Sequence, residues 1–454
     1  MKDLQPRAQW RSFHSYVLVT TGAIIGLGNV FQFPLLVAKY GGLFLLFYIL
    51  CELFISLPLL FAELLVGRRG KHNPVDSINI LAMEADASRK WGKLGWLCVF
   101  IVTATLCYYV VSAAFPVGYF LDSLKELSVH GNQTVTVTLD TDLQQNFLKL
   151  EFCFLFFLFL AMFVVYRGIN RGLEQISAIT VPAYFLIFLI LAIYINVSGN
   201  NFMDSIHEMI AIHPSQTILT VFVAALTFAF FKFGVGMGTM IVYGSYLPYS
   251  VSLARSTLVV VAIDALVSLL CYFIVNPLIL TLPVDTFLKE VTNRNIIHVF
   301  TNIPHGILIA SVFFFGAILA AWTPIIAMLE TAVITLVERL NITRAAAVVF
   351  ISSIIFLVGS LQVYAIVYWA DIIAWHGISI NYFLRDFTGN ILEPISALFL
   401  VLFVGYVVKR QVSFNELQFS PPVFKLWRFL VRYVALISIV VILVTVTILD
   451  TWIF

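Results

Sequence analysis

Apolar segments long enough to cross a bilayer follow one another along almost the whole chain. A helix needs about 20 mostly apolar residues to span the hydrocarbon core. Because 61% of the 454 residues are hydrophobic and only 11% are charged, no water-soluble packing scheme hides this surface. We therefore predict an all-α integral membrane protein with eleven transmembrane helices, over residues 13–38, 42–66, 91–123, 149–166, 173–196, 216–246, 254–280, 306–338, 344–366, 377–408 and 426–452.

Several other classes of function leave no signal in the sequence. The net charge of +2 gives no indication of a nucleic-acid partner. The five cysteines lack metal-binding spacing, and neither an HExxH nor a GxSxG motif is present. We therefore expect no enzyme activity and no bound cofactor, and the lipid bilayer is the expected surrounding. The oligomeric state is not indicated.

Positive charges predict the orientation. Lys and Arg concentrate in loops that face the cytoplasm. Most of the 26 basic residues fall on the side that carries the N-terminus and the 67–94 loop. We therefore expect a cell-membrane protein whose N-terminus is cytoplasmic and whose C-terminus, after an odd number of spans, lies outside.

Two spans contain clusters of glycine at mid-membrane depth. The first holds Gly22, Gly26 and Gly28 before Asn29, and the sixth holds three glycines after Lys232. Such clusters can serve close helix packing. In corresponding positions of two halves, however, they indicate interrupted helices around a transporter site. We therefore predict one transporter domain over residues 1–454, with five-helix repeats at 13–196 and 216–408 and an additional helix at 426–452.

Short motifs in matching order resemble the neurotransmitter:sodium symporter family, in particular its bacterial, eleven-span, leucine-transporter-like members. The similar segments are Gly26–Asn29, Phe33-Pro34, Gly41-Gly42, Phe61–Leu64, Gly67-Arg68, Tyr108-Tyr109, Tyr243–Tyr246 and Thr388–Leu392. The resemblance implies an inverted repeat of five helices with breaks in helices 1 and 6. It also implies a secondary active transporter that works by alternating access and binds an amino acid at the midplane.

The resemblance further implies a set of substrate-binding residues. Tyr109 is expected to donate its hydroxyl hydrogen to the substrate carboxylate. Met237 is flexible and polarizable, and the pocket has no free side-chain charge, which favours neutral, large hydrophobic or aromatic amino acids. Each pocket position could also be ordinary core. The implied set is Ile24, Gly26, Gly28, Thr105, Tyr109, Phe231, Gly234, Met237, Ile325 and Met328.

At the family's first sodium site, Asn29 is retained but Lys232 and Asp264 replace neutral ligands. Either charge alone is costly inside the membrane, whereas together they can form a pair that replaces the ion. The alternative is that Lys232 snorkels to the interface. The second sodium site is implied at Gly22, Ile25, Ala320 and Thr323, but Pro324 stands where the family has a serine.

The gates are partly retained. The inner gate is expected from Arg7, Trp10, Tyr246 and Glu338, and the outer gate from Gln32 and Arg385. Glu393 either relays protons or pairs within the bundle. The possible coupling ion is sodium at the second site, with a proton as the alternative. An ion-uncoupled or proton-coupled exchanger and a substrate sensor without net transport stay open.

Overall fold

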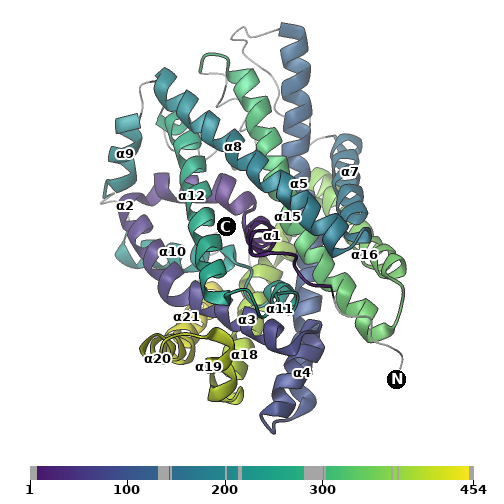
Figure 1. Ribbon diagram of the computed structural model, residues 1–454. Helices are drawn as coiled ribbons and strands as arrows, with labels where there is room; N and C mark the ends of the chain where they lie inside the picture. Colours follow the sequence, from purple (N-terminus) through teal and green to yellow (C-terminus); the bar gives the residue numbers. More distant parts are fainter. Residues whose placement is uncertain are drawn as a thin grey trace.

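The computed structural model describes residues 8–130, 143, 146–199, 202–212, 217–280, 300, 303–369, 372–375 and 378–448. It is helical almost throughout (Figure 1). The first part of the chain forms α1 (Phe13–Ile24), η1 (Gly28–Gln32), α2 (Phe33–Cys51), η2 (Glu52–Ser56), α3 (Leu57–Gly70), α4 (Pro74–Glu84), η3 (Arg89–Trp91), α5 (Gly92–His130), α7 (Phe147–Tyr166), η4 (Ile169–Leu173), α8 (Glu174–Gly199) and α9 (Phe202–Ile210).

The second part continues the helical series and adds one short strand pair. Its elements are α10 (Ile218–Lys232), α11 (Thr239–Ser245), α12 (Leu253–Leu280), α15 (Gly306–Leu340), α16 (Arg344–Tyr368), β1 (Ile373–Trp375), β2 (Ile378–Ser379), α17 (Ile380–Phe387), η5 (Thr388–Leu392), α18 (Glu393–Leu402), η6 (Phe403–Val407), α19 (Arg410–Leu417), α20 (Pro421–Phe429), η7 (Leu430–Ala435) and α21 (Leu436–Ile448).

Nine helical stretches in the described ranges are long and apolar enough to cross a membrane, and residues 218–232 form a shorter apolar helix. The outward faces carry exposed large apolar side chains such as Phe159, Ile190 and Leu357. Lipid rather than water suits such a surface. The prediction of a multi-pass helical membrane protein is thus confirmed.

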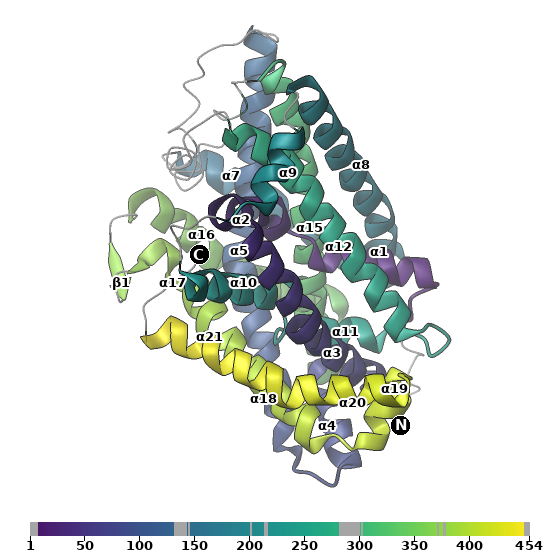
Figure 2. The same cartoon turned by 90° about the vertical axis from the view of Figure 1, so that its left-hand side faces the viewer.

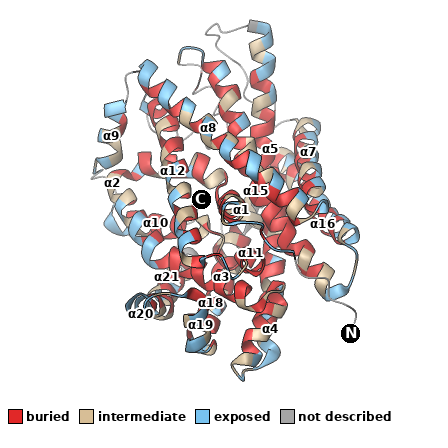
Figure 3. Ribbon diagram, viewed as in Figure 1, coloured by how far each residue is buried: buried red, intermediate tan, exposed pale blue. Residues whose placement is uncertain are grey.

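Buried residues concentrate around α1, α11 and α15, whereas α8 and α20 expose much of their surface (Figure 3). Helix α15 is the central element and packs along both α5 and α8. Helices α20 and α21 lie across α18 at one side of the molecule (Figure 2). The cavity described below therefore lies among the most buried elements.

The first two predicted spans are separated by a glycine corner. The backbone is helical from residue 28 to residue 70 except at Gly41, where φ is 67° and ψ is −156°. Residues other than glycine rarely adopt this conformation. A Cβ on the next glycine, Gly42, would lie 2.7 Å from the Ile210 carbonyl oxygen. Glycine therefore permits both the corner and the close approach of α9.

Two helices stop within the buried centre. Helix α1 ends at Ile24, Ile25 is extended, and helical backbone resumes at Gly28. Helix α10 ends at Lys232 and α11 begins at Thr239. The three glycines between them, at positions 234, 236 and 238, have φ values of 57°, 101° and 73°. Their missing side chains allow a left-handed backbone at this depth.

One part of the helical prediction is wrong in detail. The tenth span was expected to be helical from residue 377, but β1 and β2 pair antiparallel before α17 begins at Ile380. The mixed composition of this region, with Trp, His and Asp among apolar residues, suits a short hairpin better than a lipid-exposed helix.

Candidate functional site

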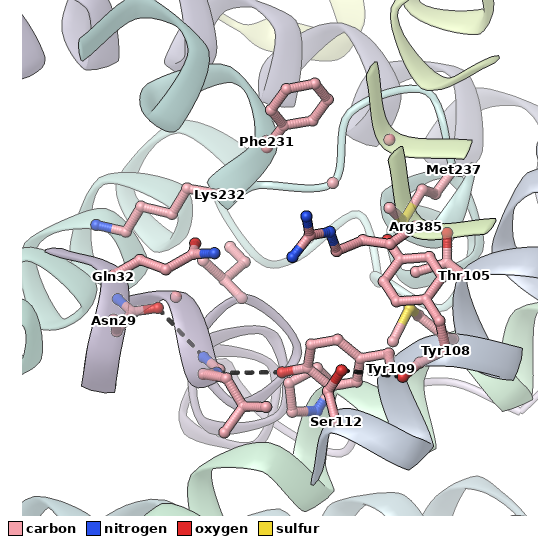
Figure 4. Close-up of a pocket in the computed structure, with 18 of the residues that line it drawn as sticks. Asn29, Gln32, Thr105, Tyr108, Tyr109, Ser112, Phe231, Lys232, Met237 and Arg385 are labelled. Carbon is pink, nitrogen blue, oxygen red and sulfur yellow. Dashed lines mark hydrogen bonds between the residues drawn. The ribbon is translucent and has the colours of Figure 1, made fainter. Parts of the chain in front are cut away.

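A cavity of about 440 Å³ lies where the interruptions of α1 and α10 meet α5, α15 and α18 (Figure 4). Nine of the ten predicted substrate residues line it: Ile24, Gly26, Gly28, Thr105, Tyr109, Phe231, Gly234, Met237 and Met328. Ile325 is the exception, because it is fully buried in the core and its neighbour Pro324 lines the cavity instead. Tyr108, Ser112 and Asn390 also line the cavity and were not predicted as substrate residues.

Tyr109 contacts the interrupted backbone directly. Its hydroxyl oxygen accepts a hydrogen bond from the Leu27 backbone N–H at 3.2 Å. A Cβ added to Gly26 would lie 2.4 Å from this oxygen, so only glycine leaves room for the contact. The hydroxyl hydrogen remains available for an acceptor in the cavity. The position thus suits recognition of a carboxylate.

Lys232 and Asp264 form a buried ion pair. The Lys232 Nζ lies 2.5 Å from Asp264 Oδ2, and their side chains are 1% and 0% exposed. The ammonium also donates to the Tyr48 hydroxyl and, at 3.2 Å, to Ser268 Oγ. These three acceptors match the three N–H groups of a lysine. Lys232 therefore points into the protein and does not snorkel to an interface.

Asn29 connects this pair to the interrupted helix. Its side-chain nitrogen donates to Asp264 Oδ1 at 2.7 Å and to Ser268 Oγ at 2.9 Å, while its oxygen accepts from the Gly26 N–H at 3.2 Å. The Asn29 oxygen is thus bonded to the Gly26 N–H and not to Lys232. Asp264 bridges the two residues because it accepts from both.

The four predicted residues of the second sodium site lie together between α1 and α15. A Cβ on Gly22 would lie 3.1 Å from Thr323 Cβ, which shows how closely the helices approach. Pro324 has no N–H and cannot bond the Ala320 carbonyl four residues earlier. That carbonyl instead receives a hydrogen bond from the Thr323 hydroxyl at 3.4 Å. Ile25 is also buried beside the break, and backbone and hydroxyl oxygens are the ligand type that a small hard cation prefers.

Trp10 and Tyr246 of the expected inner gate lie in contact, with charged side chains next to Tyr246. Trp10 donates from its backbone to the Tyr246 carbonyl and from its indole to the Tyr243 carbonyl, both at 3.0 Å. The Tyr246 hydroxyl donates to Glu330 at 3.0 Å, and Arg344 forms an ion pair with the same carboxylate. The contacts of Glu330 and Arg344 with this cluster were not predicted, although an acid inside an apolar span was a usable signal.

The expected pair of Arg7 and Glu338 is described on one side alone, because Arg7 lies outside the described residues. Glu338 accepts hydrogen bonds from the backbone and side chain of Asn73 at 2.9 and 2.8 Å. At the outer end, Gln32 and Arg385 both line the cavity. Arg385 donates to Asp386 at 2.7 Å, so the span-10 cation has a neighbouring acid.

Two further acids lie behind the α10–α11 interruption. Glu63 is fully buried and accepts from the Gly236 N–H at 2.8 Å. Glu393 is 2% exposed and lines the cavity, and it interacts electrostatically with Glu63. On the same glycine, Ser396 of α18 donates a hydrogen bond to the Gly236 carbonyl at 2.7 Å. The left-handed segment is therefore supported from α3 and α18.

Several known proteins are similar to this chain in sequence. The sequence profile of the sodium:neurotransmitter symporter family matches residues 7–142. An uncharacterised sodium-dependent transporter of Bacillus subtilis is 27% identical over 97% of this chain and 98% of its own, and one of Haemophilus influenzae is 26% identical over the same shares. A rat sodium-dependent neutral amino acid transporter, B(0)AT2, is 34% identical over 26% of this chain and 16% of its own.

The fold is also that of a solved structure. The crystal structure of MhsT in complex with L-phenylalanine superimposes with a TM-score of 0.86, at 22% sequence identity, over 97% of this chain and 100% of that chain. In motifs, in full-length sequence and in fold, this chain is therefore similar to proteins of the sodium:neurotransmitter symporter family and to sodium-dependent transporters.

Proposed function

We propose that the protein is a secondary active transporter of neutral amino acids, with large hydrophobic or aromatic ones as its main substrates. The cavity between the two interrupted helices carries this proposal, because it combines a carboxylate donor with an apolar lining. The relative named as a neutral amino acid transporter and the phenylalanine complex of MhsT support the substrate class.

The proposed topology has eleven spans, with spans 1 and 6 interrupted. The nine long helical stretches account for the other nine spans. Helix α1 with η1 and the start of α2 would supply the first span, and α10 with α11 would supply the sixth. Residues 13–196 and 216–408 would be the two inverted repeats, which rock around the cavity in alternating access.

The substrate would lie with its carboxylate against Tyr109 and the backbone near Gly28. Its side chain would contact Phe231, Met237 and Met328, which line the cavity. Helical backbone begins at Gly28, so the helix dipole favours an anionic group there. These contacts do not require a charged side chain on the substrate.

The ion pair of Lys232 and Asp264 would replace the first sodium. In this structure the ammonium is occupied by protein acceptors, so its proposed task is to hold Asp264 in place. Asp264 in turn orients Asn29, whose oxygen accepts from the Gly26 N–H. The pair therefore supports the shape of the first break without a metal ion. Sodium at Gly22, Ile25, Ala320 and Thr323 is proposed as the remaining metal site.

The experiment combines transport with substitution of the pair. Purified protein in liposomes should accumulate L-phenylalanine or L-leucine when sodium and proton gradients are imposed separately. Lys232→Thr and Asp264→Asn should each weaken binding strongly, because removing one member of a buried pair costs about 3–5 kcal/mol. The double variant removes both charges and should recover part of the binding, with a greater dependence on sodium.

Two results would contradict parts of this proposal. Binding of glutamate or lysine, without binding of any large neutral amino acid, would exclude the substrate class. Binding that is tight in the wild type but never followed by uptake under either gradient would favour a substrate sensor. Equal sodium dependence in the wild type and the double variant would contradict the replacement of the first sodium.

A further inference from the structure

Glu52 is a second buried carboxyl group beside Lys232. The residue is 5% exposed and begins the π-helical segment η2 between α2 and α3. Its carboxyl group lies close enough to Tyr48, Lys232 and Asp264 to interact electrostatically with each of them. Single π-helical turns are frequent at functional sites, and acids within spans are rarely retained for packing alone.

Hydrogen bonds and one ion pair link Tyr48, the neighbour of Glu52, to the interruption of the first span. The Tyr48 hydroxyl accepts from Lys232, so its own hydrogen can be donated to Glu52. Lys232 pairs with Asp264, and Asp264 accepts from Asn29. Asn29 finally accepts from the Gly26 N–H at 3.2 Å. A change of charge at Glu52 therefore alters the contacts that hold the backbone at the substrate cavity.

The charges of this cluster balance only when one carboxyl group is neutral. One ammonium faces two acids, and all three residues are buried in the membrane-spanning core. An uncompensated charge there is costly. Asp264 forms the ion pair with Lys232 and accepts a hydrogen bond from Asn29, whereas Glu52 forms no ion pair with any residue in the described part of the chain. The protonated form of Glu52 fits this geometry better than the carboxylate.

We propose that Glu52 is the proton-binding residue that couples a proton to substrate binding. With Glu52 protonated, Lys232 stays on Asp264 and the break is held ready for substrate. When the proton leaves for water, the second negative charge draws the ammonium towards Glu52 and loosens the Asp264–Asn29 contact. The step adds or removes one proton on a carboxylate oxygen and changes no other covalent bond. This inference rests on the proposed transport function.

The other ionisable groups around η2 have partners of their own. The segment packs against α2, α3, α10 and η7. From α3, Glu63 bonds the Gly236 N–H, and from η7, Arg432 donates to the Gly405 carbonyl at 2.6 Å. Tyr433 of η7 is about half exposed.

The remaining contributions come from α2, α10 and the helices beside the ion pair. Helix α2 contributes Tyr48, and α10 contributes Lys232. Next to the ion pair lie Tyr184 of α8 and Cys271 of α12. Glu52 and Asp264 are thus both attracted electrostatically to Lys232.

The test measures substrate binding against pH on the purified full-length protein. We expect the affinity for L-phenylalanine to rise as pH falls, by at most about tenfold per pH unit, the limit for one coupled proton. Glu52→Gln mimics the protonated form, so its affinity should stay near the acidic-pH value of the wild type at every pH. The matched control is Glu151→Gln, which changes another acid within a span, bonded to Ser360. It should keep the pH dependence of the wild type.

A second measurement covers the case in which Glu52→Gln does not fold. Infrared difference spectroscopy should show a carboxylic-acid C=O band in the wild type that changes on substrate binding. Tyr48→Phe keeps Glu52 but breaks the link to Lys232, so it should keep the band and lose most of the pH dependence of binding.

Three results would overturn the inference: pH-independent binding by the wild type, unchanged pH dependence in Glu52→Gln, or absence of the carboxylic-acid band. Failure of the wild type to bind any large neutral amino acid at any pH would instead contradict the proposed function. The two failures are therefore distinguishable.

Discussion

At the first break, close contacts restrict which residue types single positions can hold. Gly26 is the clearest case, since an added Cβ would lie 2.4 Å from the Tyr109 hydroxyl oxygen. The glycine thus keeps the hydroxyl within reach of the Leu27 N–H and of the cavity. Substitution here should affect substrate recognition before it affects the remainder of the fold.

We expect Gly26→Ala to weaken amino-acid binding by about tenfold or more, because overpacking costs about 1–3 kcal/mol and moves the carboxylate donor. Titration of L-phenylalanine by calorimetry would measure the loss. Gly389→Ala is the matched comparison, since a Cβ on this other cavity glycine would meet no atom within 4 Å. Adding Tyr109→Phe to Gly26→Ala should restore thermal stability but not binding. Wild-type affinity in Gly26→Ala would contradict this role.

The sequence predicted which residues would surround the cavity but not all of their partners. Glycine clusters and an intramembrane Lys signal special backbone and charge within one segment. They do not reveal that the three donors of Lys232 would be taken by Tyr48, Ser268 and Asp264. The sequence also does not reveal that Glu52 lies near Lys232, because this proximity depends on how α2 packs against α10.

At the scale of elements, the spans were predictable from hydropathy because each helix must be long and apolar on its own. Contacts between elements were not. Glu330 of α15 shows this, since it accepts from Tyr246 at the end of α11 and pairs with Arg344 at the start of α16. The same limit explains why the β1–β2 pair before α17 was missed: no long apolar pattern marks it.

We expect Arg344→Ala to destabilise the protein around Glu330. Glu330 is fully buried, so losing the cation leaves a buried charge, at a cost of about 3–5 kcal/mol. Thermal unfolding in detergent should show a clearly lower midpoint. Arg339→Ala provides the control, because the Arg339–Asp76 pair is about one-third exposed and is worth about 0–1 kcal/mol. Equal shifts in the two variants would contradict a special role for Arg344.

At the scale of the whole molecule, the similarity to sodium-dependent transporters and the shared fold are consistent with the proposed transporter and its central cavity. The orientation of the chain in the membrane is a separate question. It rests on the bias of Lys and Arg, which concentrate around α4 and η3 and in the other loops on that side. The same bias predicts that α8 ends on the outer side, because four spans separate it from the cytoplasmic N-terminus.

Labelling of introduced cysteines tests this orientation directly. The five native cysteines are all buried, so background reaction with a membrane-impermeant maleimide should be low. Ser88 precedes η3 and Ser198 lies near the end of α8, and both are exposed. In intact cells, Ser198→Cys should react and Ser88→Cys should not, whereas both should react after permeabilisation. Positive charge is held at the cytoplasmic face during insertion, so the reverse pattern would require the basic loops to have crossed the membrane. That result would invert the proposed topology and leave the cavity and its ion pair unchanged.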